Sequence, residues 1–278
     1  MATPSPALDV ERYAPFLAEG IAFDEPRPGV LRLRLTRPEM WNAMPLAFHD
    51  GLPDLFAQIA GDRTVSAFMM AVTGKVFSSG GDVNEGMPER HTGELLELQR
   101  VAMRVITRLL EVPQPTICVV NGTAIGFAAS LALHFDFIVA ADHATFRDSH
   151  AAFGAAPGDG LALILQAALA PALAREVLYG GRVLSAEEAA HHGLVNRVVP
   201  LERVDEEAFA LLEQVQSMAP LAVLAGKTIV NAPLRARAET LLSNAAAVEM
   251  ITLASEDFRR AIDGFLSSGR FDQRWQGR

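Results

Sequence analysis

The sequence predicts an α/β protein with parallel strands, followed by a C-terminal region made only of helices. Apolar runs as short as strands alternate with longer segments of helical periodicity along residues 1–200. The runs 67–72 and 116–120 are apolar throughout, which is typical of parallel strands covered on both faces. The rest of the chain is rich in alanine and leucine and predicts helices interrupted near Pro220 and Pro233.

The other elements follow in chain order. Residues 30–35 alternate leucine and arginine, which predicts a strand with one solvated face. Residues 45–59 carry apolar side chains at helical spacing, although Gly51 and Pro53 count against an unbroken helix. Capping and turn signals then predict a loop at 75–85, helices at 94–112 and 122–134, strands at 135–141, from 145 and at 194–199, and a helix that begins after Ser185.

Composition excludes several classes of protein. A net charge of -9 and a pI near 5.3 argue against a nucleic-acid-binding surface. The single cysteine, Cys118, excludes an internal disulfide and a thiolate metal cluster, and no other metal-ligand spacing is found. We therefore expect no nucleic-acid partner and no bound metal.

No targeting or membrane segment is predicted. The first residues lack the basic start and apolar core of a secretory signal. The longest apolar run, 161–173, contains Gln166 and Pro171 and is too short to cross a bilayer. We expect a cytoplasmic protein that is not associated with a membrane.

One stretch, residues 144–161, concentrates polar groups suited to acid–base chemistry. His150 lies between Asp148 and Asp159, and the glycines and proline around Asp159 place that carboxylate on a tight turn. An aspartate can hold an imidazole in one tautomer and favour its charged form, which makes the pair a candidate general base. The alternative is that the turn aspartate binds backbone N–H groups and that His150 is a structural residue.

Two glycine-containing loops each follow a buried strand, at 76–82 and 121–127. In parallel α/β proteins ligands bind at the carboxyl ends of strands, and backbone N–H groups freed at such turns can hold a developing oxyanion. The alternative is that the glycines only permit tight turns.

Taken together, these motifs resemble the enoyl-CoA hydratase/isomerase, or crotonase, superfamily. The resemblance covers nearly the whole chain, and the motifs occur in the family's order. They are residues 35–44, 73–82, 115–126 with Asp136, 157–160 and 185–199.

The resemblance implies a spiral of ββα units as a core domain at 1–200 and a helical C-terminal oligomerisation region at 201–278, in a homotrimer or hexamer. It also implies that the backbone amides of Ser79 and Phe127 form an oxyanion hole, with Gly80 and Asp82 in the same substrate-binding loop. The family usually has glycine where Phe127 stands, so its ring is expected to narrow the pocket.

The acid–base residues depart from the usual pattern. The two glutamates of the hydratases would fall at Ser130 and His150, and neither is a carboxylate. The pair of His150 and Asp159 is instead similar to that of 6-oxocamphor hydrolase, a crotonase relative that cleaves a carbon–carbon bond between two ketones by adding water. The similarity extends to His49, to Phe146 and Asp148 just before the histidine, and to Glu249.

The sequence thus predicts an enzyme in which His150, oriented by Asp159, activates a water. The amides of Ser79 and Phe127 hold the oxyanion of an acyl-CoA or β-diketone substrate. His49 and Glu249 are further candidate catalytic residues. No cofactor is expected beyond coenzyme A as part of the substrate. The alternatives are an enoyl-CoA hydratase/isomerase that uses other acid–base residues, and a non-catalytic acyl-CoA-binding homologue.

Overall fold

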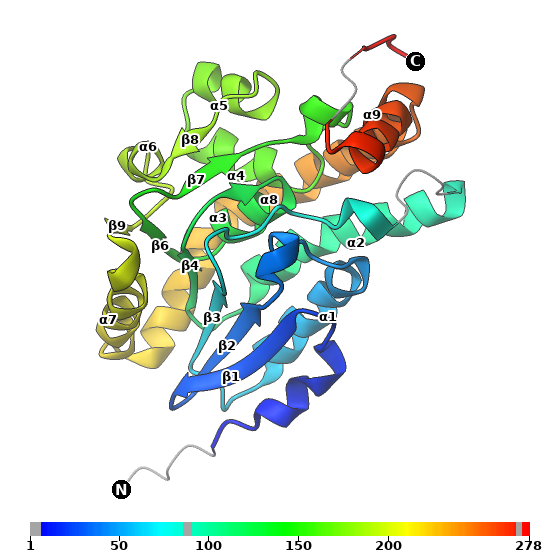
Figure 1. The fold of residues 1–278 in the computed structure, drawn as a ribbon. Helices are drawn as coiled ribbons and strands as arrows, with labels where there is room; N and C mark the ends of the chain where they lie inside the picture. Colours follow the sequence, from blue (N-terminus) through cyan, green and yellow to red (C-terminus); the bar gives the residue numbers. More distant parts are fainter. Residues whose placement is uncertain (1–6, 86–90, 271–273) are drawn as a thin grey trace, which may run out of the picture.

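The chain folds around a six-stranded sheet and a smaller three-stranded sheet, with helices packed around both (Figure 1). The computed structural model describes residues 7–85, 91–270 and 274–278. In the larger sheet β1 and β2 are antiparallel, and every later neighbouring pair is parallel. Its strands, in spatial order, are β1 (Ile21–Arg27), β2 (Val30–Leu35), β3 (Ala67–Val72), β4 (Thr116–Val120), β6 (Phe137–Ala141) and β9 (Arg197–Val199).

The smaller sheet joins two parts of the predicted site. Strand β5 (Ala124–Ile125) pairs in parallel with β7 (Thr145–Arg147), which pairs antiparallel with β8 (Leu184–Ser185). Because β5 ends the second loop and β7 leads toward His150, their pairing places the loop beside the histidine.

The helices enclose the sheets and form one wall of the site. Helix α1 packs against α2, α8 packs against α2 and α4, and α7 packs against β4 and β6. The α-helices are α1 (Leu46–Gly61), α2 (Thr92–Glu111), α3 (Phe127–Leu133), α4 (Leu161–Ala168), α5 (Pro171–Leu178), α6 (Ala186–His191), α7 (Val204–Gln216), α8 (Pro220–Leu253) and α9 (Glu256–Ser268). The 3-10 helices are η1 (Val10–Phe16), η2 (Pro38–Met40), η3 (Val83–Glu85), η5 (His150–Phe153) and η6 (Leu201–Arg203).

A small apolar cluster holds the C-terminal helices against the His150 segment. It consists of Ala155, Met250, Leu253, Phe258 and Ile262, from the η5 segment, α8 and α9. Each large side chain buried in this way contributes roughly 1.5–3 kcal/mol to folding. The cluster therefore fixes the end of α8 over η5, separately from the main core between the large sheet and its helices.

The structure confirms the predicted fold class and corrects some elements. The strands predicted at 30–35, 67–72 and 116–120 are β2, β3 and β4. The predicted interruption near Pro233 is wrong: α8 continues through it, as α1 continues through Pro53. A proline removes one intrahelical hydrogen bond, and the packing of α8 on α2 and α4 holds both halves in place.

Strand β1 was not predicted because it carries charged residues and a proline. It pairs with β2 at the edge of the sheet, where a strand tolerates both. The predicted boundary at residue 200 follows β9, and the division into two domains stays a prediction. Of the described residues, no single helix has the length and apolar character to cross a membrane. By length and composition alone, Leu201–Gln216 and Pro220–Leu253 meet that test only as a pair bent by 106°.

Candidate active site

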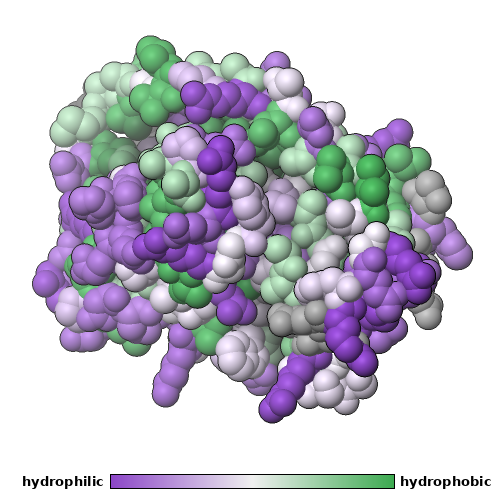
Figure 2. Space-filling view, turned by 90° about the horizontal axis from the view of Figure 1, so that it is seen from above, coloured by the Kyte–Doolittle hydropathy of each residue, from purple (hydrophilic) through white to green (hydrophobic). Residues whose placement is uncertain are grey.

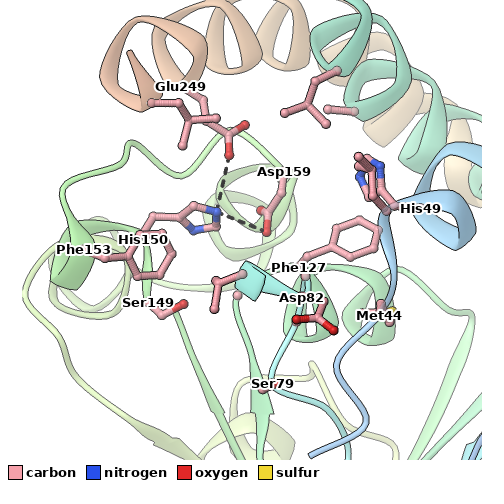
Figure 3. Close-up of a pocket in the computed structure, with 18 of the residues that line it drawn as sticks. Met44, His49, Ser79, Asp82, Phe127, Ser149, His150, Phe153, Asp159 and Glu249 are labelled. Atoms are coloured by element: carbon pink, nitrogen blue, oxygen red, sulfur yellow. Dashed lines mark ion pairs between the residues drawn. The ribbon is translucent and has the colours of Figure 1, made fainter. Parts of the chain in front are cut away.

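A pocket at the carboxyl ends of β3 and β4 collects the predicted site residues (Figure 3). It encloses about 140 Å³ and is lined by residues from both loops, η5, α1, α2, α8 and α9. His150, Asp159 and Glu249 face one another on one side, and His49 and Phe127 lie on the other. The predicted residues that line it are His49, Ser79, Gly80, Asp82, Phe127, His150, Asp159 and Glu249.

The first loop is held by a strained turn that precedes α1. Trp41 and Asn42 have φ values of 57° and 50°, in the left-handed region that non-glycine residues rarely adopt. Hydrogen bonds of the Asn42 side chain offset this strain. The side chain accepts from the N–H of Arg37 and donates to the carbonyls of Thr73 and Val76. The turn thus holds the first part of the loop that follows β3.

The same turn uses the backbone amide that the sequence assigned to an oxyanion hole. The Ser79 N–H donates to the Trp41 carbonyl at 3.0 Å. Ser79 lines the pocket, but its amide is not available for a ligand, so that prediction needs correction. Among the described residues, the Gly81 N–H has no acceptor, and a side chain built there would meet nothing within 4 Å. Gly81 is therefore the better source of the first free amide.

Local pairing explains why Gly81, and not its neighbours, presents a free amide. The Met44 N–H donates to the Gly80 carbonyl at 2.8 Å, and the Asp82 N–H donates to the Met44 carbonyl at 3.0 Å. This isolated parallel bridge engages the residues on either side of Gly81 and turns the Gly81 N–H away from Met44.

The second free amide belongs to Phe127. Phe127 is the first residue of α3, where an N–H has no carbonyl acceptor within the helix. The Ile125 N–H donates to the Ser78 carbonyl at 3.0 Å, which ties the two loops together. Gly80 permits this approach: its φ is +90°, and a side chain there would lie 2.8 Å from the Ile125 carbonyl oxygen.

His150 is held by Asp148. The two oxygens of Asp148 lie 3.2 and 3.1 Å from Nδ1 of His150, and the His150 backbone N–H donates to Oδ1 of Asp148 at 2.8 Å. The sequence assigned the orienting role to Asp159, but Asp159 lies beside the other ring nitrogen. Asp148, and not Asp159, faces Nδ1 because the short 3-10 turn η5 begins at His150 and brings the ring next to Asp148.

Two carboxylates flank the Nε2 atom of His150. Oε1 of Glu249 lies 3.5 Å away, and Oδ2 of Asp159 lies 3.7 Å away. Oδ1 of Asp159 accepts the Leu161 N–H at the start of α4, whereas its buried Oδ2 has no hydrogen-bond partner among the described residues. Asp159 thus presents one uncommitted oxygen, and the structure brings Glu249 to the same atom of His150.

The turn that carries Asp159 is supported from beneath and packed from above. The Ser130 hydroxyl, at one of the positions where the hydratases carry glutamate, donates to the Asp159 carbonyl at 2.9 Å. A side chain at Gly158 would lie 2.5 Å from Cβ of Glu249 and 2.9 Å from the Ala245 carbonyl oxygen. Only glycine at this position lets α8 approach closely enough for Glu249 to reach His150.

Proton affinities in this group are strongly perturbed. Burial alone would lower the pKa of His150, but the charges of Asp159 and Asp148 and the contact with Glu249 raise it well above 6.5. Burial raises the pKa of the Asp159 carboxyl from 3.8 to about 6; the charge of His150 opposes that rise, and Asp148 and Glu249 add to it. At neutral pH the group therefore holds a proton donor beside a proton acceptor.

The opposite wall is aromatic. The rings of His49 and Phe127 meet edge to face with centroids 4.6 Å apart, so the Phe127 ring occupies space beside the acid–base group. Nδ1 of His49 lies 3.6 Å from Oδ1 of Asp50 and has no hydrogen bond among the described residues. Asp82 accepts from Asn84 and faces Arg37 at 3.6 Å, which marks it as a residue that stabilises the loop.

Sequence reasoning missed the free amide of Gly81, gave the orienting role to Asp159 and not to the nearby Asp148, and gave Phe153 no role. The Phe153 ring lies 5.8 Å from that of His150 and closes the apolar side of the pocket. Asp148 could have been recognised from its place two residues before the histidine, whereas Gly81 carries no side-chain signal. Within the described residues, no three histidine, cysteine or acidic side chains are grouped to hold a metal ion.

Comparison with known proteins agrees with this architecture. The enoyl-CoA hydratase/isomerase family matches residues 25–278. A carnitinyl-CoA dehydratase of Citrobacter koseri is 34% identical over 78% of this chain and 82% of its own length, and a 1,2-epoxyphenylacetyl-CoA isomerase of Escherichia coli is 28% identical over 86% and 92%. The crystal structure of an enoyl-CoA hydratase/isomerase from Mycobacterium paratuberculosis superimposes with a TM-score of 0.83 at 26% identity, covering 89% of this chain and 98% of that one.

The fold and these similarities define a crotonase-type enzyme. The chain belongs to the enoyl-CoA hydratase/isomerase family.

Proposed function

We propose that this enzyme adds water to an acyl-CoA ester, or removes it, by way of an enolate. The backbone amides of Gly81 and Phe127 hold the thioester oxygen as it becomes negative, and His150, Asp159 and Glu249 move the protons. The observation that carries this proposal is the placement of Nε2 of His150 within 3.5–3.7 Å of two carboxylates, in the pocket onto which the two free amides open.

The proposed reaction has two steps, the addition of water and the protonation of the enolate. Asp159 takes a proton from water as the water oxygen bonds to the β-carbon of an α,β-unsaturated thioester. The double-bond electrons move to the thioester oxygen, and Gly81 and Phe127 donate hydrogen bonds to it. Protonated His150 then gives its Nε2 proton to the α-carbon as the carbonyl re-forms. The proton on Asp159 returns to His150 across 3.7 Å.

The relative pKa values support these roles. A general acid and a general base work best with pKa values near the operating pH. Asp159, with a pKa of about 6, is mostly ionised at pH 7, while His150 keeps its proton. In the resting enzyme the base is therefore Asp159 and the acid is His150, whereas the sequence assigned the role of base to His150 and an orienting role to Asp159.

The pocket limits the size of the reacting group. An apolar cavity of about 150 Å³ can hold a benzene ring, and this pocket encloses about 140 Å³. We therefore propose that a short acyl chain or a single ring reacts. The similarity to a carnitinyl-CoA dehydratase and a 1,2-epoxyphenylacetyl-CoA isomerase supports a CoA ester as the substrate class.

A second candidate is hydrolysis of a β-diketone. It is favoured by one observation: His49, His150, Asp159 and Glu249, which the sequence predicts from a resemblance to 6-oxocamphor hydrolase, line one pocket. In this reaction Asp159 takes a proton from water, and the hydroxide formed bonds to one carbonyl carbon. The adjacent carbon–carbon bond breaks, and its electrons form the enolate of the other ketone, which His150 protonates.

A thermal-shift titration distinguishes the candidates. The purified protein is titrated with acetoacetyl-CoA, with free CoA, and with cyclic and linear 1,3-diketones. A ligand at one hundred times its Kd stabilises a protein by about 2.7 kcal/mol, which a melting curve resolves. Stabilisation by the CoA compounds, followed by turnover of short enoyl-CoA esters, is the expected result. Stabilisation by diketones alone overturns the first candidate in favour of the second, and binding of CoA esters without turnover indicates an acyl-CoA-binding homologue.

We also propose that the enzyme is a homo-oligomer, a trimer or hexamer, assembled through α8. Four large apolar side chains on this helix are more than 70% exposed in the single chain, namely Leu221, Ile229, Val230 and Ile251. Seen from above, hydrophobic residues gather in separate groups among hydrophilic ones (Figure 2). Light scattering tests the proposal, and a monodisperse monomer contradicts it.

A further inference from the structure

We infer that Asp148 is a positioning residue for the acid–base step: it fixes a proton on Nδ1 of His150 and so makes Nε2 the atom that exchanges protons in the pocket. This inference rests on the proposed function for its kinetic consequence, but not for its structural content. Asp148 belongs to neither of the two oxyanion loops, and its side chain is 1% exposed.

The contacts of Asp148 leave His150 little freedom. Its Oδ1 and Oδ2 atoms lie 3.2 and 3.1 Å from Nδ1 of the ring. A carboxylate only accepts hydrogen bonds, so the ring nitrogen that faces it carries the hydrogen. The backbone N–H of His150 donates to Oδ1 at 2.8 Å, so one carboxylate fixes both the main chain and the ring of the same residue.

The other ring nitrogen has different surroundings. Nε2 lies 3.5 Å from Glu249 and 3.7 Å from Asp159, at the pocket. These distances exceed a strong hydrogen bond and leave room for a proton to pass when a ligand draws the groups together. With Nδ1 committed to Asp148, an imidazole that loses a proton loses it from Nε2, beside the carboxylates that can take part in the reaction.

Asp148 also has a structural role in the main chain, which a test must separate from its effect on the ring. The aspartate also holds the first residue of the 3-10 turn η5 by accepting the His150 N–H. The variant D148N separates the two roles, because its amide oxygen can still accept from the backbone N–H, whereas the negative charge and the second acceptor that face Nδ1 are lost. The hydrogen bond from the His150 backbone N–H is then preserved, while the charge that favours a hydrogen on Nδ1 is removed.

The test measures the imidazole directly by nitrogen-15 NMR with selectively labelled histidine. In the wild type, His150 should show a protonated Nδ1 with a strongly deshielded hydrogen at pH 7, and that signal should disappear in D148N. The control is D62N, which alters another buried aspartate, bonded to Tyr13 and Thr64 outside the pocket. This control should leave the His150 signals unchanged.

The kinetic arm uses whichever substrate the enzyme turns over. D148N should lower kcat by roughly 100-fold, the scale of one positioned proton transfer, with KM within about threefold, and should move the alkaline limb of the pH profile to lower pH. The melting temperature of D148N should stay close to that of the wild type.

Two results overturn the inference. One is a wild-type His150 whose Nδ1 carries no proton at pH 7, which needs no variant to fold. The other is a folded D148N that keeps both the Nδ1 signal and the wild-type kcat. If the wild type turns over neither class of substrate, the proposed function fails, but the NMR arm still decides the role of Asp148.

Discussion

Two buried histidines in this enzyme differ in what surrounds them. His134, at the end of α3, is 4% exposed, and His150, at the start of η5, is 7% exposed. Nδ1 of His134 contacts the Ser130 carbonyl at 2.7 Å, and burial lowers the pKa of this histidine to about 4. Three carboxylates around His150 raise its pKa well above 6.5 despite similar burial.

The difference shows that burial alone keeps a histidine neutral and structural, whereas burial among carboxylates keeps the imidazole protonated and able to donate a proton. Only the second arrangement opens onto a pocket with free backbone amides. The two residues should therefore respond oppositely to substitution and to pH.

The largest expected effect is on turnover. H150Q should lower kcat by roughly 100-fold or more, because it removes the proton donor of the proposed reaction. H134Q should leave kcat within about threefold, since His134 does not line the active-site pocket. Steady-state kinetics on both variants checks this. Equal losses in the two variants would remove the functional distinction between them.

The next effect is on stability at acidic pH, and its sign differs between the histidines. The pKa of His134 lies below its unfolded value of 6.5, so the unfolded chain binds more protons between pH 4 and 6.5. The contribution of neutral His134 to the free energy of unfolding is present above pH 6.5. It is lost as the pH falls, by up to about 3 kcal/mol. The contribution of His150 is instead present below 6.5 and is lost as the pH rises through its raised pKa.

Urea unfolding at fixed protein concentration measures the first part of this prediction. The quantity to compare is the free energy of unfolding of the wild type minus that of H134Q. This difference should be about 2–3 kcal/mol smaller at pH 4.5 than at pH 7. A difference that does not change with pH would mean that His134 is not held neutral by burial.

A smaller effect concerns the acid limb of the pH profile. Below a pH of about 6, kcat/KM should fall as Asp159 becomes protonated, by tenfold for each further pH unit. D159N should lose most of the activity and also this limb. A profile of the wild type that is flat from pH 7 to 5 would show that Asp159 is not the base.

The smallest effect tests how α8 shapes the surroundings of His150. G158A should destabilise the protein by roughly 1–3 kcal/mol, because the new methyl group would force Glu249 and α8 outward. G226A, within α8, is the matched control because its added carbon would contact nothing within 4 Å. It should stabilise the protein by up to about 1 kcal/mol. Chemical denaturation of both variants decides whether the close approach of α8 matters.

The sequence reveals features that depend on local pattern or on motif order. Apolar runs predict the buried strands, and the resemblance places His49, Phe127 and Glu249 in one pocket although they are far apart in the chain. It cannot resolve which of two aspartates faces Nδ1 of His150, or which neighbouring amide is free. Both depend on tertiary contacts: the η5 turn selects Asp148, and the Trp41 carbonyl occupies the amide of Ser79.

Long helices expose a different limit. Pro233 is a local signal against a helix, yet α8 continues because it packs on α2 and α4. Packing between distant segments overrides a local preference of a few kcal/mol.

The most direct test of the central claim is a pH titration of the histidine side chains in the wild-type enzyme by nitrogen-15 NMR, with H150Q and H134Q used for assignment. At pH 7 both ring nitrogens of His150 should carry protons, while His134 should be neutral and remain so until the pH approaches 4. A neutral His150 at pH 7 would contradict the account, because the carboxylates around it would then not be holding the proton that the reaction uses.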